Sequence, residues 1–249
     1  MTPAMRLVLF DVDGTLISTD GAGMRAYYRA LQSVFDIKAG PGLIRPDGKT
    51  DPLIGKELLR CFDMEDRWSD ESQQKLFSSY LVHLEDEMTQ AKNRGSIRIL
   101  PGVKELLEML SRYPDFLVGL ATGNLEKGAH IKLEKAGLRK YFKFGGYGSD
   151  SEDRTFLIRV GIQRGIRAIA PSSLRGVFAV GDTPFDIIHG HAAGATVISV
   201  ASAKYSMDDL RFHNPDLLVP DLAAADLIVS FMRNNTMESG TSNRFHQDI

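Results

Sequence analysis

Five short apolar runs recur along the chain, and they constrain its fold more than any other feature. The runs are Leu7–Phe10, Phe116–Leu120, Gly176–Val180, Thr196–Val200 and Leu217–Val219. Each is mainly apolar at successive positions, which is typical of strands buried on both faces of a sheet. The glycine-rich segment Gly145–Gly148 has no such run and is expected to be a loop. Because helical patterns lie between the runs, the sequence predicts an α/β fold with a Rossmann-like parallel sheet.

The stretch from about Gly21 to Gly95 departs from this alternation, because it contains helical patterns and no convincing strand. One helix is expected to begin at Asp51-Pro52, as N-cap and first helical residue, and another to stop near Gly95. Three stripes of apolar residues recur at a spacing of three or four: Met24, Tyr27, Tyr28, Leu31, Val34 and Phe35; Ile54, Leu58, Cys61 and Phe62; and Leu76, Phe77, Tyr80, Leu81, Leu84 and Met88.

These patterns divide the chain into an α/β core and an inserted domain. We expect an all-helical cap at 17–96 and a core formed by 1–16 and 97–233. The polar segment 234–249 has few apolar residues and is predicted to be a disordered tail.

Composition narrows the classes of function. The chain has 249 residues, 43% hydrophobic and 25% charged, which is enough for a sizeable core. Its formal net charge of −2 argues against a nucleic-acid platform, which usually carries a basic excess. A single cysteine, Cys61, excludes an intrachain disulfide and fits a reducing compartment. No apolar stretch approaches the roughly 20 residues that span a bilayer, so we expect a cytoplasmic protein without membrane association.

Polar residues follow three of the predicted strands. Asp11 and Asp13 come directly after the first strand, and residues two apart on an extended backbone face the same side. Thr122-Gly123-Asn124 follows the second strand and offers a hydroxyl, a backbone N–H and an amide to an anion. Asp182 and Asp186 follow another strand. In a parallel sheet these strand ends share one edge, so the clustered carboxylates predict an oxygen-rich site suited to Mg²⁺.

These motifs resemble those of the haloacid dehalogenase superfamily of phosphohydrolases. The resemblance rests on the segments 11–16 (DVDGTL), 121–124 (ATGN) and 180–186 (VGDTPFD), with an all-helical insert after the first motif. It extends from about Met5 to Ser230. The insert is similar to the cap of the branch that includes phosphoglycolate phosphatases and β-phosphoglucomutases, in which the cap closes over the active site.

The resemblance implies a role for each matching residue. Asp11 is the expected nucleophile and a metal ligand, and Asp13 is the expected general acid and base, with its backbone carbonyl on the metal. Thr122 is expected to bind the transferring phosphoryl group, together with backbone N–H groups near Gly123 and Asn124. Asp182 is expected to ligate Mg²⁺, and Asp186 to be a metal ligand or a partner of one.

One position departs from the superfamily pattern. A lysine usually precedes the helix before the last motif, and the matching slot here holds Arg154. Arginine is always charged and can bind phosphate through two donors, so the electrostatic role could survive. Lys140 and Lys143 are the alternatives, although they lie earlier in the chain.

The sequence thus predicts an Mg²⁺-dependent phosphatase that hydrolyses a small phosphate monoester through an aspartyl phosphate. Two alternatives stay open: β-phosphoglucomutase-like transfer, and a non-catalytic phospho-receiver or binding module. Arg45 and Lys49, in a loop of the insert, are candidates for contacting the anionic end of a small phosphorylated metabolite. The physiological substrate and the oligomeric state cannot be read from these motifs.

Overall fold

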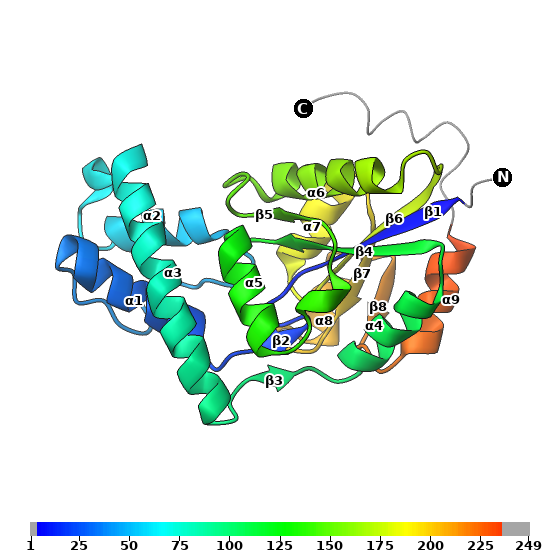
Figure 1. The fold of residues 1–249 in the computed structure, drawn as a ribbon, viewed down its shortest axis with the longest axis horizontal. Coiled ribbons are helices and arrows are strands. Elements are labelled where there is room, and N and C mark those ends of the chain that lie inside the picture. Colours follow the sequence, from blue (N-terminus) through cyan, green and yellow to red (C-terminus); the bar gives the residue numbers. More distant parts are fainter. Residues whose placement is uncertain (1–3, 236–249) are drawn as a thin grey trace.

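A six-stranded parallel sheet forms the centre of the computed structural model, which describes residues 4–235 (Figure 1). The strand order is β5-β4-β1-β6-β7-β8. The strands are β1 (Met5–Phe10), β4 (Phe116–Thr122), β5 (Gly145–Tyr147), β6 (Leu174–Gly181), β7 (Thr196–Val200) and β8 (Leu217–Val219). The α/β class is therefore confirmed, with five strands at the predicted runs. The exception is β5, which lies where a loop was expected.

The order of the strands creates a natural binding position beside β1. From β1 the chain passes to β4 and β5 on one side, then crosses to β6, β7 and β8 on the other. Ligands of open α/β sheets bind beyond the carboxyl ends of strands at such a reversal. The carboxyl ends of β1, β4 and β6 carry the three sequence motifs, so the topology brings the motifs to one place.

Three helices occupy the segment between the first and second motifs: α1 (Ala22–Phe35), α2 (Asp51–Arg60) and α3 (Asp70–Asn93), with the 3₁₀ turn η1 (Glu65–Arg67). The chain enters and leaves through the short antiparallel pair β2 (Ile17–Ser18) and β3 (Arg98–Ile99). The helices share a separate apolar cluster, in which the rings of Tyr27 and Tyr80 stack with centroids 4.2 Å apart. This helical insert, residues 19–97, therefore has its own core.

The start of α2 and the end of α3 lie close to the positions expected from the sequence. The N-cap of α2 is Thr50, whose hydroxyl accepts from the N–H of Leu53, so Asp51 and Pro52 are the first two helical residues. The predicted start was one residue late. Gly95, with φ 67°, follows the last turn of α3, as expected for a glycine that ends a helix.

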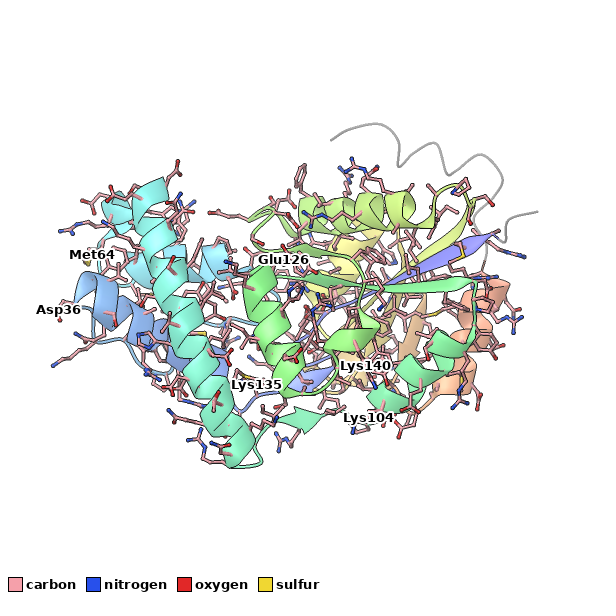
Figure 2. The ribbon with its side chains drawn as sticks, in the orientation of Figure 1. Asp36, Met64, Lys104, Glu126, Lys135 and Lys140 are labelled. Atoms are coloured by element: carbon pink, nitrogen blue, oxygen red, sulfur yellow. The ribbon has the colours of Figure 1, made fainter. Side chains whose placement is uncertain are left out.

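Helix α5 (Glu126–Lys135) lies between the insert and the sheet (Figure 1). Figure 2 labels its two ends, Glu126 and Lys135. Lys135 forms an ion pair with Glu85 of α3, which joins core and insert. The insert also contacts the core at the start of α2, where the N–H of Asp51 donates to the carbonyl of Gly123 (2.7 Å).

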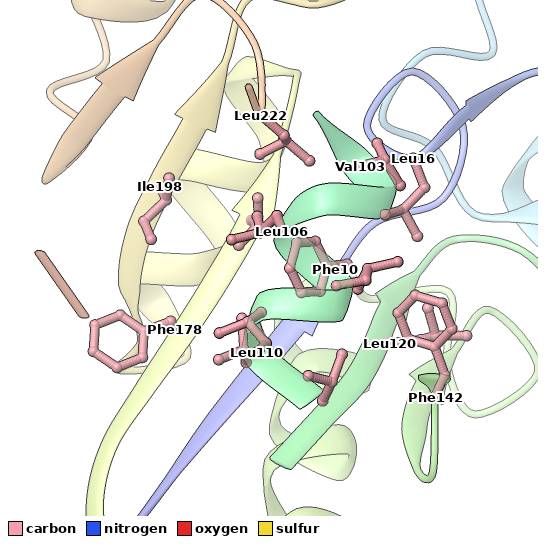
Figure 3. Close-up of a cluster of buried hydrophobic side chains, with 14 of the residues drawn as sticks. Phe10, Leu16, Val103, Leu106, Leu110, Leu120, Phe142, Phe178, Ile198 and Leu222 are labelled. Atoms are coloured by element: carbon pink, nitrogen blue, oxygen red, sulfur yellow. The ribbon is translucent and has the colours of Figure 1, made fainter. Parts of the chain in front are cut away.

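Both faces of the sheet are covered, which explains the unbroken apolar runs. Val8 and Phe10 of β1 belong to one large cluster, whereas Leu7 and Leu9 face the opposite layer. Figure 3 shows Phe10 among side chains of neighbouring strands and of α4, to which Leu106 belongs. The remaining helices are α4 (Val103–Arg112), α6 (Arg154–Ile169), α7 (Pro184–Ala192), α8 (Met207–Arg211), α9 (Ala225–Asn234) and the 3₁₀ turn η2 (Arg139–Tyr141).

The tail predicted at 234–249 lies, from residue 236 on, outside the described residues. Within residues 4–235, no helix combines the length and apolar character needed to cross a bilayer.

Candidate active site

The end of β1 carries the first two carboxylates. Asp11 is buried, and its backbone N–H still donates to the carbonyl of Val180 in β6 (2.9 Å). The side chain of Asp13 is 44% exposed and lines the cavity described below. Gly14 follows with φ 83°, and a Cβ there would lie 2.4 Å from Oδ2 of Asp182. Glycine is needed at this turn both for its conformation and for the approach of Asp182.

The end of β6 brings in the second pair. Oδ1 of Asp182 accepts from the Thr15 hydroxyl (2.8 Å), so the first motif orients the third. Asp186 lies at the third position of α7 and forms a capping box with Thr183. Its Oδ2 accepts from the Thr183 N–H (2.9 Å) and hydroxyl (2.8 Å). One carboxylate oxygen of Asp186 thus fixes the start of the helix, and the other, Oδ1, accepts from the guanidinium of Arg154.

Three of these carboxylates form a cluster. Asp11, Asp182 and Asp186 are buried and can each offer one oxygen within 4.8 Å of the others. Burial raises the pKa of Asp11 to about 6, with Asp186 and Asp13 adding to the effect against Arg154 and Thr122. Burial, Asp186 and Asp11 also raise the pKa of Asp182 well above its ordinary value. Such an all-oxygen donor set fits a hard divalent cation, whose charge would favour ionised carboxylates.

Arg154 lies against this cluster. The residue is 5% exposed at the first position of α6, and its guanidinium pairs with Asp186 and lies 3.5 Å from Oδ2 of Asp11. Burial lowers the pKa of Arg154, but Asp186 and Asp11 more than compensate and raise it overall. Its Nε atom is buried without a hydrogen-bond partner among the described residues.

The two alternative lysines lie elsewhere. Lys140 belongs to η2, with its ammonium 5.0 Å from the centre of the Tyr141 ring. Lys143 is exposed. Neither is among the described residues that line the cavity, so the structure brings Arg154 to the carboxylates and leaves both lysines outside.

The loop after β4 completes the site. Nδ2 of Asn124 donates to Oγ1 of Thr122 and to Oδ2 of Asp13, both at 2.8 Å. A Cβ on Gly123 would lie 2.2 Å from the carbonyl oxygen of Lys49, so the insert packs directly on this loop. The predicted residues after β4 therefore meet both the acidic pair of β1 and the insert.

Sequence reasoning missed one residue of the site, Lys132. It lies on α5, is 4% exposed, and donates from Nζ to Oδ2 of Asp13 (2.5 Å) and Oδ1 of Asn124 (2.6 Å). Burial lowers the pKa of Lys132, but Asp13 and Asp51 outweigh this and raise it, so the side chain stays an ammonium. The available signal was a lysine within the apolar stripe that Ala129 and Leu133 define on α5.

The carboxylates open onto a cavity of about 490 Å³ between core and insert. Its insert side includes Met24, Tyr27, Ile54 and Tyr80. Lys49 also lines it, but the ammonium of Lys49 pairs with Glu57 of the insert. Arg45 is exposed and is not among the described lining residues. This volume is in the range of small-molecule sites.

Comparison with known proteins relates this site to a family. A model of the family described as haloacid dehalogenase-like hydrolase matches residues 8–200. The chain is 26% identical over 230 residues to a phosphoglycolate phosphatase from Agrobacterium fabrum, an alignment that covers 89% of this chain and 91% of the relative.

Solved structures share the fold. One is a predicted phosphoglycolate phosphatase from Haemophilus somnus (TM-score 0.66, 20% identity, 90% of this chain and 98% of that one). Another is a β-phosphoglucomutase from Clostridium difficile (TM-score 0.66, 15% identity, 93% and 98%). At these identities the structures show a common fold alone, whereas the family match spans all three motifs. The chain therefore belongs to the haloacid dehalogenase-like hydrolases.

Proposed function

We propose that this protein is a phosphatase that hydrolyses small phosphate monoesters through a phosphate ester on Asp11. The observation that carries the proposal is the different setting of two neighbouring carboxylates. Asp11 is buried beside Arg154, whereas Asp13 reaches the cavity and is bonded to Asn124. Such a pair can divide the work between a nucleophile and an acid/base.

The first displacement would begin with an oxygen of Asp11 attacking phosphorus. The bond between phosphorus and the ester oxygen breaks, and Asp13 gives its proton to that oxygen as it leaves. The Thr122 hydroxyl, the backbone N–H groups near Gly123 and Asn124, and Arg154 would hold the phosphoryl oxygens. All of these residues line the cavity together.

The second displacement would release phosphate. Asp13 takes a proton from a water molecule, whose oxygen attacks the phosphorus of the aspartyl phosphate. The bond from phosphorus to Asp11 breaks, which restores the carboxylate. Asp11 and Asp182, with the carbonyl of Asp13 and with Asp186 as ligand or partner, would hold Mg²⁺. When bound, Mg²⁺ supplies positive charge against the phosphoryl oxygens.

The test compares the wild-type chain with Asp11→Asn on p-nitrophenyl phosphate and 2-phosphoglycolate, with Mg²⁺ or with excess chelator. We include 2-phosphoglycolate because one relative is named a phosphoglycolate phosphatase. Wild type should turn over only with Mg²⁺, and Asp11→Asn should lose activity by at least about 10³-fold, because the amide is no nucleophile. The exposed Asp36→Asn is the matched control, since asparagine tolerates its left-handed backbone.

Two outcomes would contradict the proposal. Near wild-type turnover by a folded Asp11→Asn chain would exclude the covalent step. A phosphorylated chain that does not turn over would indicate a receiver. The same assay applied to glucose 1-phosphate separates hydrolysis, which releases phosphate, from a mutase, which forms glucose 6-phosphate.

A further inference from the structure

Lys132 is a second buried cation of the site, and the proposed chemistry gives it no role. Its ammonium has three N–H donors. Two are used on Oδ2 of Asp13 and Oδ1 of Asn124, at 2.5 and 2.6 Å. An ammonium in a buried position is costly unless it is paired and hydrogen-bonded. The fold therefore places this charge where it acts on Asp13.

The contacts around Lys132 form a closed triangle. Lys132 bonds to Asp13 and to Asn124, and Asn124 bonds to Asp13 through Nδ2 at 2.8 Å. The same Nδ2 also donates to Thr122. Because Lys132 occupies the amide oxygen of Asn124, it fixes which end of that amide faces Asp13. A rotated amide would set its oxygen against the carboxylate.

The two cations of the site divide its carboxylates between them. Arg154 pairs with Asp186 and lies 3.5 Å from Asp11, on the side of the nucleophile. Lys132 pairs with Asp13. The core thus supplies one buried cation to each of the two proposed catalytic carboxylates.

The insert closes the space around the ammonium. A Cβ on Gly23 of α1 would lie 3.4 Å from Nζ of Lys132 and 3.9 Å from the hydroxyl oxygen of Tyr80. Asp51 of α2 accepts from the N–H of Leu125, at the start of the helix that carries Lys132 (2.8 Å). These contacts limit the positions that the lysine and its partners can take.

We propose that Lys132 is a positioning residue for proton transfer. It holds the Asp13 carboxyl group and the Asn124 amide in the geometry in which Asp13 can donate its proton to the leaving oxygen. This inference rests on the proposed phosphatase function. Lys132 acts through Asp13, so its removal should matter most when the leaving oxygen needs a proton. An alkyl phosphate has such a leaving group, whereas p-nitrophenolate departs as a stable anion.

The activity test uses Lys132→Met, Lys132→Arg and the control Lys127→Met, which removes an exposed lysine from the same helix. For glycerol 3-phosphate, Lys132→Met should lower kcat by about 10²- to 10³-fold, within the range of acid–base contributions. For p-nitrophenyl phosphate the loss should be at most about tenfold, and KM should change little for either substrate. Lys132→Arg should recover part of the loss. Equal losses on both substrates would overturn the proposal.

A crystal structure of Lys132→Met gives a readout that needs no activity. We expect the contact between Asn124 Nδ2 and Asp13 Oδ2 to be lost, with a wild-type thermal unfolding midpoint to within a few degrees as the check on folding. An unchanged contact would overturn the positioning role. If the wild-type chain hydrolyses neither substrate, the proposed function fails, and this structural comparison still decides the role of Lys132.

Discussion

Arg154 is the residue on which the buried carboxylates depend. Its guanidinium is 5% exposed and pairs with Asp186 beside Asp11. Removing one partner from a buried ion pair leaves an uncompensated charge and costs about 3–5 kcal/mol. A mutation here therefore acts on stability as well as on catalysis, and the two effects need separate measurements.

We predict that Arg154→Ala lowers kcat on p-nitrophenyl phosphate by at least about 10²-fold, as the loss of one fixed electrostatic donor does. Arg154→Lys should restore part of this activity, because a lysine keeps the charge but loses the planar fork. Arg159→Ala, an exposed position on the same helix, is the control for folding. Wild-type activity in Arg154→Ala would direct attention to Lys140 and Lys143.

The residues of the site differ in how far the sequence could predict them. Asp11, Asp13 and Asp182 follow strands that could be recognised, and the rule that parallel strands end at one edge places them together. Lys132 is ten residues beyond Thr122 and meets Asp13 only because α5 packs back over the strand end. A contact of that kind depends on tertiary packing, which local patterns do not contain.

At the level of elements, the missed strand has a clear physical cause. β5 has three residues, two of them glycines, and so lacks the apolar run that marked the other strands. A Cβ on Gly146 would lie 1.8 Å from the carbonyl oxygen of Leu157 in α6. Glycine is required there because the helix approaches the strand closely, and this need removes the side chains that identify a strand.

The start of α2 carries a testable pH dependence through Asp51. Burial raises the pKa of Asp51 to about 6, with Asp13 adding to it and with Lys132 and the N–H of Leu125 opposing it. The folded state thus holds this proton up to a higher pH than the unfolded state does. The contribution of Asp51 to stability is therefore greatest at low pH and falls as pH rises from about 4 to above 6.

We predict that Asp51→Asn gains stability relative to wild type by about 2 kcal/mol between pH 4 and pH 7, from the difference between 3.8 and about 6. Asparagine keeps an oxygen for the N–H of Leu125 but cannot ionise. Urea unfolding in chelator at a series of pH values measures the difference, with the exposed Asp66→Asn as control. A difference that stays constant with pH would contradict the prediction.

At the scale of the whole molecule, the insert is held over the carboxyl ends of the strands at several separate points. Lys204 pairs with Asp47, Lys135 with Glu85, and the guanidinium of Arg154 donates to the carbonyl of Gly48 at 3.4 Å. The exposed pairs are individually weak, each worth roughly 0.2–1 kcal/mol. Because each of these contacts is weak, we predict that the insert can open for substrate entry and then close.

We predict that this arrangement restricts the protein to small phosphorylated metabolites, because the substrate must fit a cavity of about 490 Å³. A folded phosphoprotein should be hydrolysed at least about 100-fold less efficiently than 2-phosphoglycolate. Its bulk would keep the phosphate away from Asp11, and a displacement of about 1 Å from the reactive geometry already costs about 100-fold in rate. Asp47→Lys, which sets two cations against each other, should lower kcat/KM for the small ester a few-fold. The double exchange Asp47→Lys with Lys204→Asp should restore kcat/KM for the small ester. Efficient dephosphorylation of the phosphoprotein would show that the site stays open and would contradict the predicted restriction.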